Sequence, residues 1–153
     1  VKCDISARAK LVVKSGRAII DRCTVRAMAG IEAKVIGNRA GRLTILSIGP
    51  TPWFLREKAK IEEELEKIQQ EIYLNQGTNA AALYQMKEKP LKKTMEEMEL
   101  LVAVAAQKQI VAEKLYPMAQ VSIGGVQRNI TDYYAPCRVY LDAKEGAVKI
   151  IGV

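Results

Sequence analysis

A 20-residue repeat in the first third of the chain restricts its fold more than any other feature. Residues 5–14 align with residues 25–34, and residues 45–49 begin a third copy in the same register. Cys3, Cys23 and Leu43 extend this alignment toward the N-terminus. A unit of this length cannot bury its own apolar row, so such repeats are stable only when successive units stack on one another. The spacing therefore predicts a solenoid.

Alternation within each copy predicts that the repeating unit is made of β-strands. Small or apolar side chains alternate with mostly polar ones, which is the period of a strand with one buried face. Turn-forming residues follow the first two copies, at residues 15–17 and 37–41. We therefore expect a short right-handed β-helix with about 20 residues per coil. An antiparallel meander is the alternative, but it has no reason to keep matching columns at a fixed offset.

The middle of the chain changes to a helical pattern. Thr51 is a good N-cap and Pro52 a good first helical residue. An apolar seam with spacings of four, three and four follows, and residues 75–77 form a plausible stop. The seam consists of Ile61, Leu65, Ile68 and Ile72.

A second helical seam is predicted after Pro90 and ends before Pro117. Because the two helices have similar expected lengths, we predict an antiparallel coiled-coil hairpin over residues 51–116, with residues 76–89 at its tip. The run from Leu100 to Ala106 is apolar on every face, so a further surface should cover it. Packing against the β-coils is expected, with an oligomer contact or a partner helix as alternatives. The seam consists of Leu91, Met95, Met98 and Val102. A second apolar row lies beside it and consists of Leu101, Val104, Val111 and Leu115.

Strand-like patterns return after Pro117. Four short runs, at residues 121–123, 126–130, 137–141 and 147–151, are separated by turn residues, and residues 142–146 form the last turn. Strands on both sides of a helical insertion indicate that the chain leaves the sheet and then returns to cap it. Residues 1–50 and 117–153 are therefore predicted to form one discontinuous β-helix domain.

The residue types argue against catalysis and against a bound cofactor. The chain has no histidine, which removes the commonest general base and the commonest metal ligand. Its three cysteines do not form a CxxC pattern, and we expect Cys3 and Cys23 to be buried neighbours rather than a redox pair. The glutamates of residues 62–66 fit a solvated helix face rather than a metal site. We therefore predict no catalytic residue, no metal and no cofactor.

The positive charge of the chain is concentrated in its first third. The net charge is +7, and residues 1–50 contain ten lysines and arginines against three acids, so the rest of the chain is balanced. Protein docking is favoured for the outward cations, ahead of a role in solubility alone, and binding of nucleic acid or anionic lipid is the remaining alternative. Nucleic acid is disfavoured because no aromatic platforms or recognition motif accompany these residues. The predicted interaction surface consists of Arg8, Lys10, Lys14, Arg26 and Lys34.

The cellular setting is also indicated by the sequence. No apolar run approaches the roughly 20 residues that span a bilayer, and no signal-peptide pattern is present. Few and scattered cysteines are typical of a reducing compartment, so we expect a cytoplasmic protein. The sequence begins at Val1 within a strand-like pattern, which suggests that a further segment precedes it.

The order of these features resembles the flagellar assembly protein A family of bacteria. The resemblance rests on the repeat at residues 30–37, the strand at residues 44–49, the helical hairpin, Tyr116 and Pro117 at the re-entry, and the closing strands. It implies a cytoplasmic scaffold that acts in flagellar assembly or placement through contacts with other proteins, such as flagellar or cell-pole regulators. It also implies a further N-terminal domain, and it carries no catalytic residues. A polyanion-binding module that uses the basic face alone is the alternative function.

Overall fold

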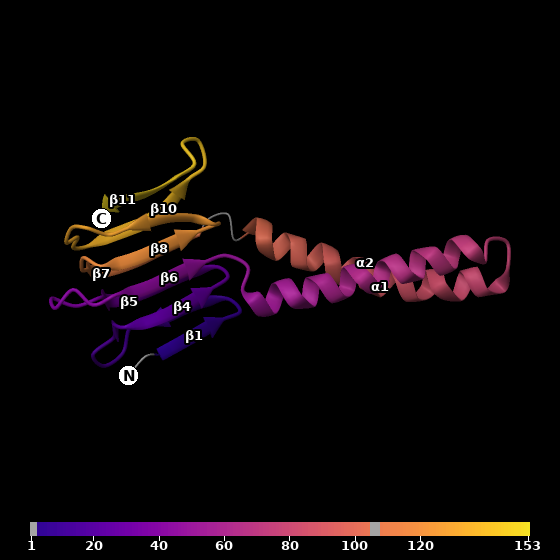
Figure 1. The fold of residues 1–153 in the computed structure, drawn as a ribbon, viewed down its shortest axis with the longest axis horizontal. Coiled ribbons are helices and arrows are strands. Elements are labelled where there is room, and N and C mark those ends of the chain that lie inside the picture. The colour runs from indigo at the N-terminus through magenta and orange to yellow at the C-terminus, as the bar shows by residue number, and fades with distance from the viewer. Residues whose placement is uncertain (1–2, 105–107) are drawn as a thin grey trace. The chain divides into compact units, whose positions relative to one another are not determined.

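The computed structural model describes residues 3–104 and 108–153 and separates the chain into two compact units (Figure 1). One unit comprises Val1–Thr51 and Val104–Val153 and holds the strands, and the other comprises Pro52–Ala103 and holds the helices. The elements are β1 (Cys3–Ala7), β2 (Lys10–Val13), β3 (Ile19–Ile20), β4 (Cys23–Ala27), β5 (Gly30–Ile36), β6 (Thr44–Ile48), α1 (Pro52–Leu74), α2 (Asn79–Val104), β7 (Gln109–Leu115), β8 (Ala119–Ile123), β9 (Val126–Asn129), β10 (Cys137–Asp142) and β11 (Ala147–Gly152).

The strands form two sheets whose parallel ladders are those of stacked coils. The first sheet has the order β1-β4-β6-β8-β9 and the second the order β11-β10-β7-β5-β2. Each coil contributes one strand to each sheet: β1 is followed by β2, β4 by β5, and β6 by β7. In the first two coils this step between the sheets takes only two residues. In the third coil, the connection between β6 and β7 is the whole segment from Gly49 to Lys108.

The predicted offset of 20 is confirmed between the first two coils and is wrong for the third. Cys3 pairs with Cys23 and Ala7 with Ala27, but Val25 pairs with Leu46, an offset of 21. The turn between β5 and β6 has five residues more than the turn between β3 and β4, and the loop between β2 and β3 has four residues more than the matching stretch of β5. The second coil is therefore longer by one residue, which reverses the faces of the next strand. Leu43, predicted to lie in the buried column, is consequently 55% exposed. The buried residues of β6 are Thr44, Leu46 and Ile48.

The core between the two sheets is narrow and aliphatic. Ile31 pairs with Ile110, which pairs with Val139, and these three side chains have no exposed surface. Beside them, Ala33 pairs with Ala112 and both are buried. Columns of small residues let the opposing walls approach closely, which explains why a chain with 5% aromatic residues can close its core.

The first predicted helix is confirmed, and the second begins earlier than predicted. Helix α1 starts at Pro52, after the buried Thr51, and ends just before the predicted stop. Helix α2 starts at Asn79 and continues through Pro90, after which we had expected it to begin. Proline inside a helix removes one backbone hydrogen bond without necessarily ending the helix, and the Thr94 hydroxyl donates to the Pro90 carbonyl at 2.9 Å. In both helices the predicted seam residues are less exposed than most of their neighbours.

Helix α2 ends at Val104, so the prediction of a helix up to residue 116 is wrong. Residues 109–115 form strand β7 instead, and Leu115, which we had placed on a helical row, has no exposed surface in the β-core. The helical unit consequently ends about a dozen residues before the predicted boundary. Ala105 and Ala106, part of the predicted apolar run, lie outside the described residues.

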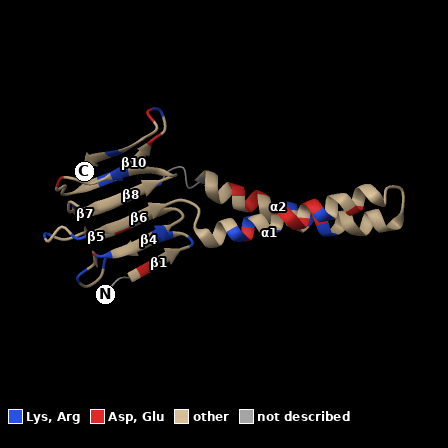
Figure 2. Cartoon of the chain, viewed as in Figure 1, with Lys and Arg blue, Asp and Glu red and all other residues tan. Residues whose placement is uncertain are grey.

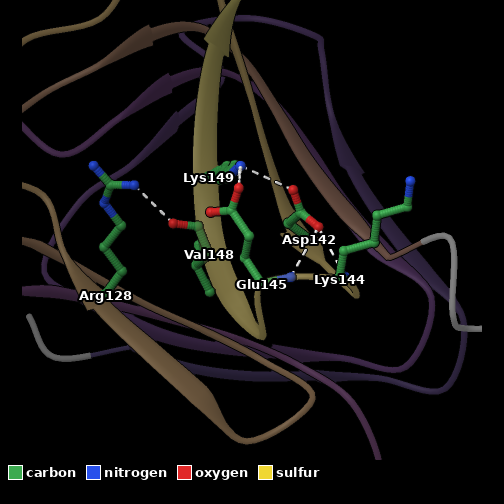
Figure 3. A network of polar contacts seen from close by, with 6 residues as sticks. All are labelled: Arg128, Asp142, Lys144, Glu145, Val148 and Lys149. Atoms are coloured by element: carbon green, nitrogen blue, oxygen red, sulfur yellow. Dashed lines mark hydrogen bonds and ion pairs between the residues drawn. The ribbon is translucent and has the colours of Figure 1, made fainter.

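The closing strands follow the prediction, and polar contacts hold their ends together (Figure 3). One Asp142 carboxylate oxygen accepts backbone N–H bonds from Lys144 and Glu145, at 2.9 and 3.3 Å. The Lys149 ammonium pairs with Asp142 at 2.9 Å and with Glu145 at 2.6 Å, which raises the pKa of Lys149 and lowers that of Asp142. Arg128 of β9 donates to the Val148 carbonyl of β11 at 2.7 Å, which joins the last strands of the two sheets.

Candidate interaction surface

Two of the predicted surface cations share one carboxylate on the second sheet. Lys10 of β2 and Lys14, just after it, lie 2.6 and 2.5 Å from the two carboxylate oxygens of Glu32. Strand pairing causes this arrangement, because Glu32 lies opposite Val12. Lys10 and Lys14 are two residues before and two residues after Val12, so their side chains lie on the same face of the sheet as Glu32. Hydrogen bonds from Lys10 and Lys14 lower the pKa of Glu32 to about 2. Glu32 therefore remains ionised and neutralises part of this surface at physiological pH.

The remaining predicted cations are divided between the sheets. Arg26 of β4 donates to Asp4 of β1 at 2.8 Å, on the first sheet. Arg8 lies in the bend between β1 and β2, and Lys34 lies on β5 of the second sheet. Figure 2 shows lysines and arginines at several separate places on the strands and their connecting turns. The five residues therefore belong to two faces and a corner, and Lys10, Lys14 and Arg26 each have an acidic partner among the described residues.

Two arginines that we had not selected line a cavity at the beginning of the first-sheet strands. The cavity has a volume of about 470 Å³, and Arg22, Arg42 and Leu43 are among its lining residues. Neither guanidinium has an ion-pair or hydrogen-bond partner among the described residues. A second cavity of about 570 Å³ also uses Leu43, together with Met118 and Ile130. The sequence did not indicate this site, because it depends on the one-residue shift that turns Leu43 outward.

The hairpin tip carries a group of exposed large apolar side chains. Tyr73 and Leu74 end α1 with 72% and 75% of their surfaces exposed, and Leu83 and Met86 in the second turn of α2 are 63% and 69% exposed. A cleft of about 660 Å³ runs along one face of α1 to this tip, lined by Glu66, Gln69, Gln70, Tyr73 and Leu74. We call Tyr73, Leu74, Leu83 and Met86 the tip cluster.

Cys3 and Cys23 are neighbours as predicted, but they are only partly buried. They are direct strand partners, and burial raises the pKa of the Cys23 thiol. Glu63 pairs with Lys67 on the surface of α1 at 2.6 Å. Among the described residues, no three acidic or cysteine side chains lie close enough to hold a metal ion. No described helix is long and apolar enough to cross a membrane.

Comparison with known proteins places this architecture in a family. Searches of curated proteins and of solved structures returned no match. The family model of the flagellar assembly protein A (FapA) beta solenoid domain matches residues 1–99, about two thirds of the chain, from β1 into α2. The chain therefore belongs to the FapA beta solenoid family.

Proposed function

We propose that this protein is a non-catalytic scaffold of bacterial flagellar assembly that binds other proteins through its helical hairpin, with the β-solenoid as a rigid support. The tip cluster is the observation that carries this proposal. Its four exposed side chains lie in the last turn of α1 and the first two turns of α2. Exposed apolar surface is characteristic of interaction sites, and tyrosine is enriched among residues that contribute most to binding. The family match supports the flagellar setting, and partners in the cytoplasm or at the cell pole fit it.

Two finer features of the fold belong to the same proposal. We propose that the coils wind with a right-handed sense, because crossover connections between parallel strands are right-handed in nearly all proteins. We also propose that α1 and α2 wind as an antiparallel coiled coil. Their least exposed residues recur at alternating spacings of three and four, and Gln69 of α1 donates to Glu88 of α2 at 3.3 Å.

The alternative is a polyanion-binding module that uses Arg8, Lys10, Lys14, Arg26 and Lys34. A polyanion at this surface would have to compete with Glu32 for two lysines and with Asp4 for Arg26. Lys34 has no partner among the described residues and is therefore the cation that best tests this function. If the surface bound polyanions, Lys34→Glu would weaken retention on heparin and reduce its salt dependence. Retention equal to that of the native protein would leave the scaffold as the better account.

Photocrosslinking in living cells tests the scaffold directly. The full-length protein, expressed in a flagellated host that lacks its own copy, would carry a photoreactive amino acid at Leu83, or at the exposed Lys60 of α1 as a control. We expect a flagellar or cell-pole protein to be crosslinked from position 83 and not from position 60. The absence of specific adducts at position 83 would contradict the proposal.

A charge placed on the tip cluster gives a functional readout of the same contact. The double variant Tyr73→Glu and Leu83→Glu should reduce swimming and the number of flagella per cell. The double variant Gln76→Glu and Gln85→Glu adds two negative charges at exposed positions in the same part of the chain and is the matched control. Equal motility of the two variants, at equal protein levels, would show that the tip cluster is not the contact.

A further inference from the structure

The two cavities beside Leu43 are neighbours on the first sheet, and together we call them the groove. A single cross-strand row provides the floor, because Thr24 of β4 pairs with Ile45 of β6, Ile45 pairs with Gln120 of β8, and Gln120 pairs with Asn129 of β9. All four residues line one or other of the cavities, and Leu43 lines both. Neighbouring strands lie about 4.8 Å apart, so the row extends over about 14 Å. That distance matches roughly four residues of extended chain.

The two ends of the groove differ in their chemistry. At the β4 end, Arg22 and Arg42 line the cavity. Asp21 precedes Arg22 but has one carboxylate oxygen buried without a hydrogen-bond partner, and it forms no ion pair with either arginine among the described residues. The basic end is thus available to an external acid, and guanidinium groups are well suited to carboxylates.

The β8 end of the groove is mainly apolar. Pro117, Met118 and Ile130 line it, and Met118 is 54% exposed on the rim. No charged residue lines this cavity, and Asp132, which follows the lining residue Thr131 in sequence, accepts a hydrogen bond from the Thr131 hydroxyl at 3.0 Å. An apolar side chain of a ligand would lose water-exposed surface here, whereas a second charge would gain no partner.

The floor supplies hydrogen-bonding groups between these two ends. The side chains of Thr24, Gln120 and Asn129 have no hydrogen-bond partner among the described residues. They are spaced by the strand ladder, so they can bond to the backbone groups of an extended segment lying across the strands. A duplex nucleic acid or a bilayer is too broad to reach such a floor, and the floor contains no aromatic residue for stacking bases.

We infer that this groove binds a short extended segment of a partner protein, with an acidic side chain between Arg22 and Arg42 and an apolar side chain about two to four residues away against Met118 and Ile130. The inference rests on the proposed scaffold function and gives it a second, chemically defined contact. It is independent of the hairpin, because every residue of the groove belongs to the solenoid unit.

Selection from a random heptapeptide display library on the full chain tests the groove. We expect the enriched peptides to combine Asp or Glu with Leu, Ile or Met at that spacing. The double variant Arg22→Glu and Arg42→Glu should bind the fluorescein-labelled consensus peptide at least roughly tenfold more weakly and should enrich Lys or Arg in place of the acid. Arg17→Glu, an exposed arginine in another turn, should bind like the native protein.

Several results would overturn the inference. These are a library that enriches no acidic and apolar pattern, the same consensus for the native protein and the double variant, or arginine-dependent binding to a DNA oligonucleotide or a phosphatidylglycerol vesicle instead of peptides. Leu43→Asp provides a second test at an exposed position where folding should be unaffected, and it should weaken the same peptide. Failure of the groove would leave crosslinking from Leu83 unchanged, and failure of the tip would leave peptide selection unchanged.

Discussion

Replacing Ile110 by alanine should destabilise the solenoid much more than replacing the adjacent Val111. Ile110 has no exposed surface and lies between Ile31 and Val139, whereas Val111 is partly exposed on the outer face of the sheet. The change removes about three buried methyl or methylene groups, each worth about 0.8 kcal/mol, and leaves a cavity that adds to the loss. We expect Ile110→Ala to lower the free energy of unfolding by about 3–4 kcal/mol and Val111→Ala by less than about 1 kcal/mol.

Protection of the Cys137 thiol gives an assay specific to this unit. The thiol is fully buried, and Cys137 pairs with Ala112 of β7. Pulsed maleimide labelling at increasing urea, with mass spectrometry of the Cys137 peptide, measures the unfolding midpoint. With a urea slope of about 1–3 kcal/mol per molar, the Ile110→Ala midpoint should fall by at least about 1 M. Equal shifts for the two variants would refute the assignment of residues 109–115 to a strand with alternating faces.

Three further perturbations test other parts of the structure. Glu32→Gln should lower the melting temperature at pH 7, and the difference from the native protein should disappear as the pH falls from about 4.5 towards 2. The reason is that a carboxylate whose pKa is lowered by folding stabilises the fold only while it is ionised. A difference in melting temperature that persists at pH 2 would argue against this ion pair. Gly37→Ala should lower the urea midpoint more than Gly16→Ala. Both glycines have a positive φ, but an added methyl at position 37 would lie 3.2 Å from the Tyr116 side chain, whereas one at position 16 would meet no atom within 4 Å. Equal losses would contradict the close approach of Tyr116. Pro90→Ala should slow amide hydrogen exchange around residue 90 and stabilise the helical unit by about 1–3 kcal/mol, because it restores a backbone hydrogen-bond donor within α2. Unchanged exchange would mean that the proline does not destabilise the helix.

The first two coils could be predicted from the sequence because no insertion separates their matching columns. The pairs Cys3 with Cys23 and Lys10 with Gly30 have the same offset as the sequence repeat. The third coil could not be placed, because the long turn falls between β2 and β3 in the first coil and between β5 and β6 in the second. The second coil is consequently one residue longer than the first, and one additional residue moves every side chain of the next strand to the opposite face.

Strand β7 was missed because its apolar residues also fit a helical row. Leu101, Val104, Val111 and Leu115 are spaced by three, seven and four residues, and the first two of them lie in the last turn of α2. A better signal was present in the repeat itself. The pattern of isoleucine, then alanine two residues later, then a large aliphatic residue three positions further occurs at residues 31–36 and again at residues 110–115.

The groove and the ion pairs require information that the sequence does not contain directly. Outward cations could be identified by alternation, but their neutralisation by Glu32 and Asp4 depends on which strands are adjacent. The floor of the groove joins residues 24 and 129, which only the ladder through β6 and β8 brings into one row. The helical seams, in contrast, are local patterns and were predicted correctly as far as the helices extend.

Replacement of residues 49–108 by the two-residue connection found between β4 and β5 tests the division between a supporting solenoid and a binding hairpin most directly. Because β6 and β7 would then be joined as β4 and β5 are, we predict a folded solenoid with a protected Cys137 thiol, combined with loss of flagellar assembly in cells that carry only this variant. Normal flagella on such cells, with Cys137 still protected, would contradict the account.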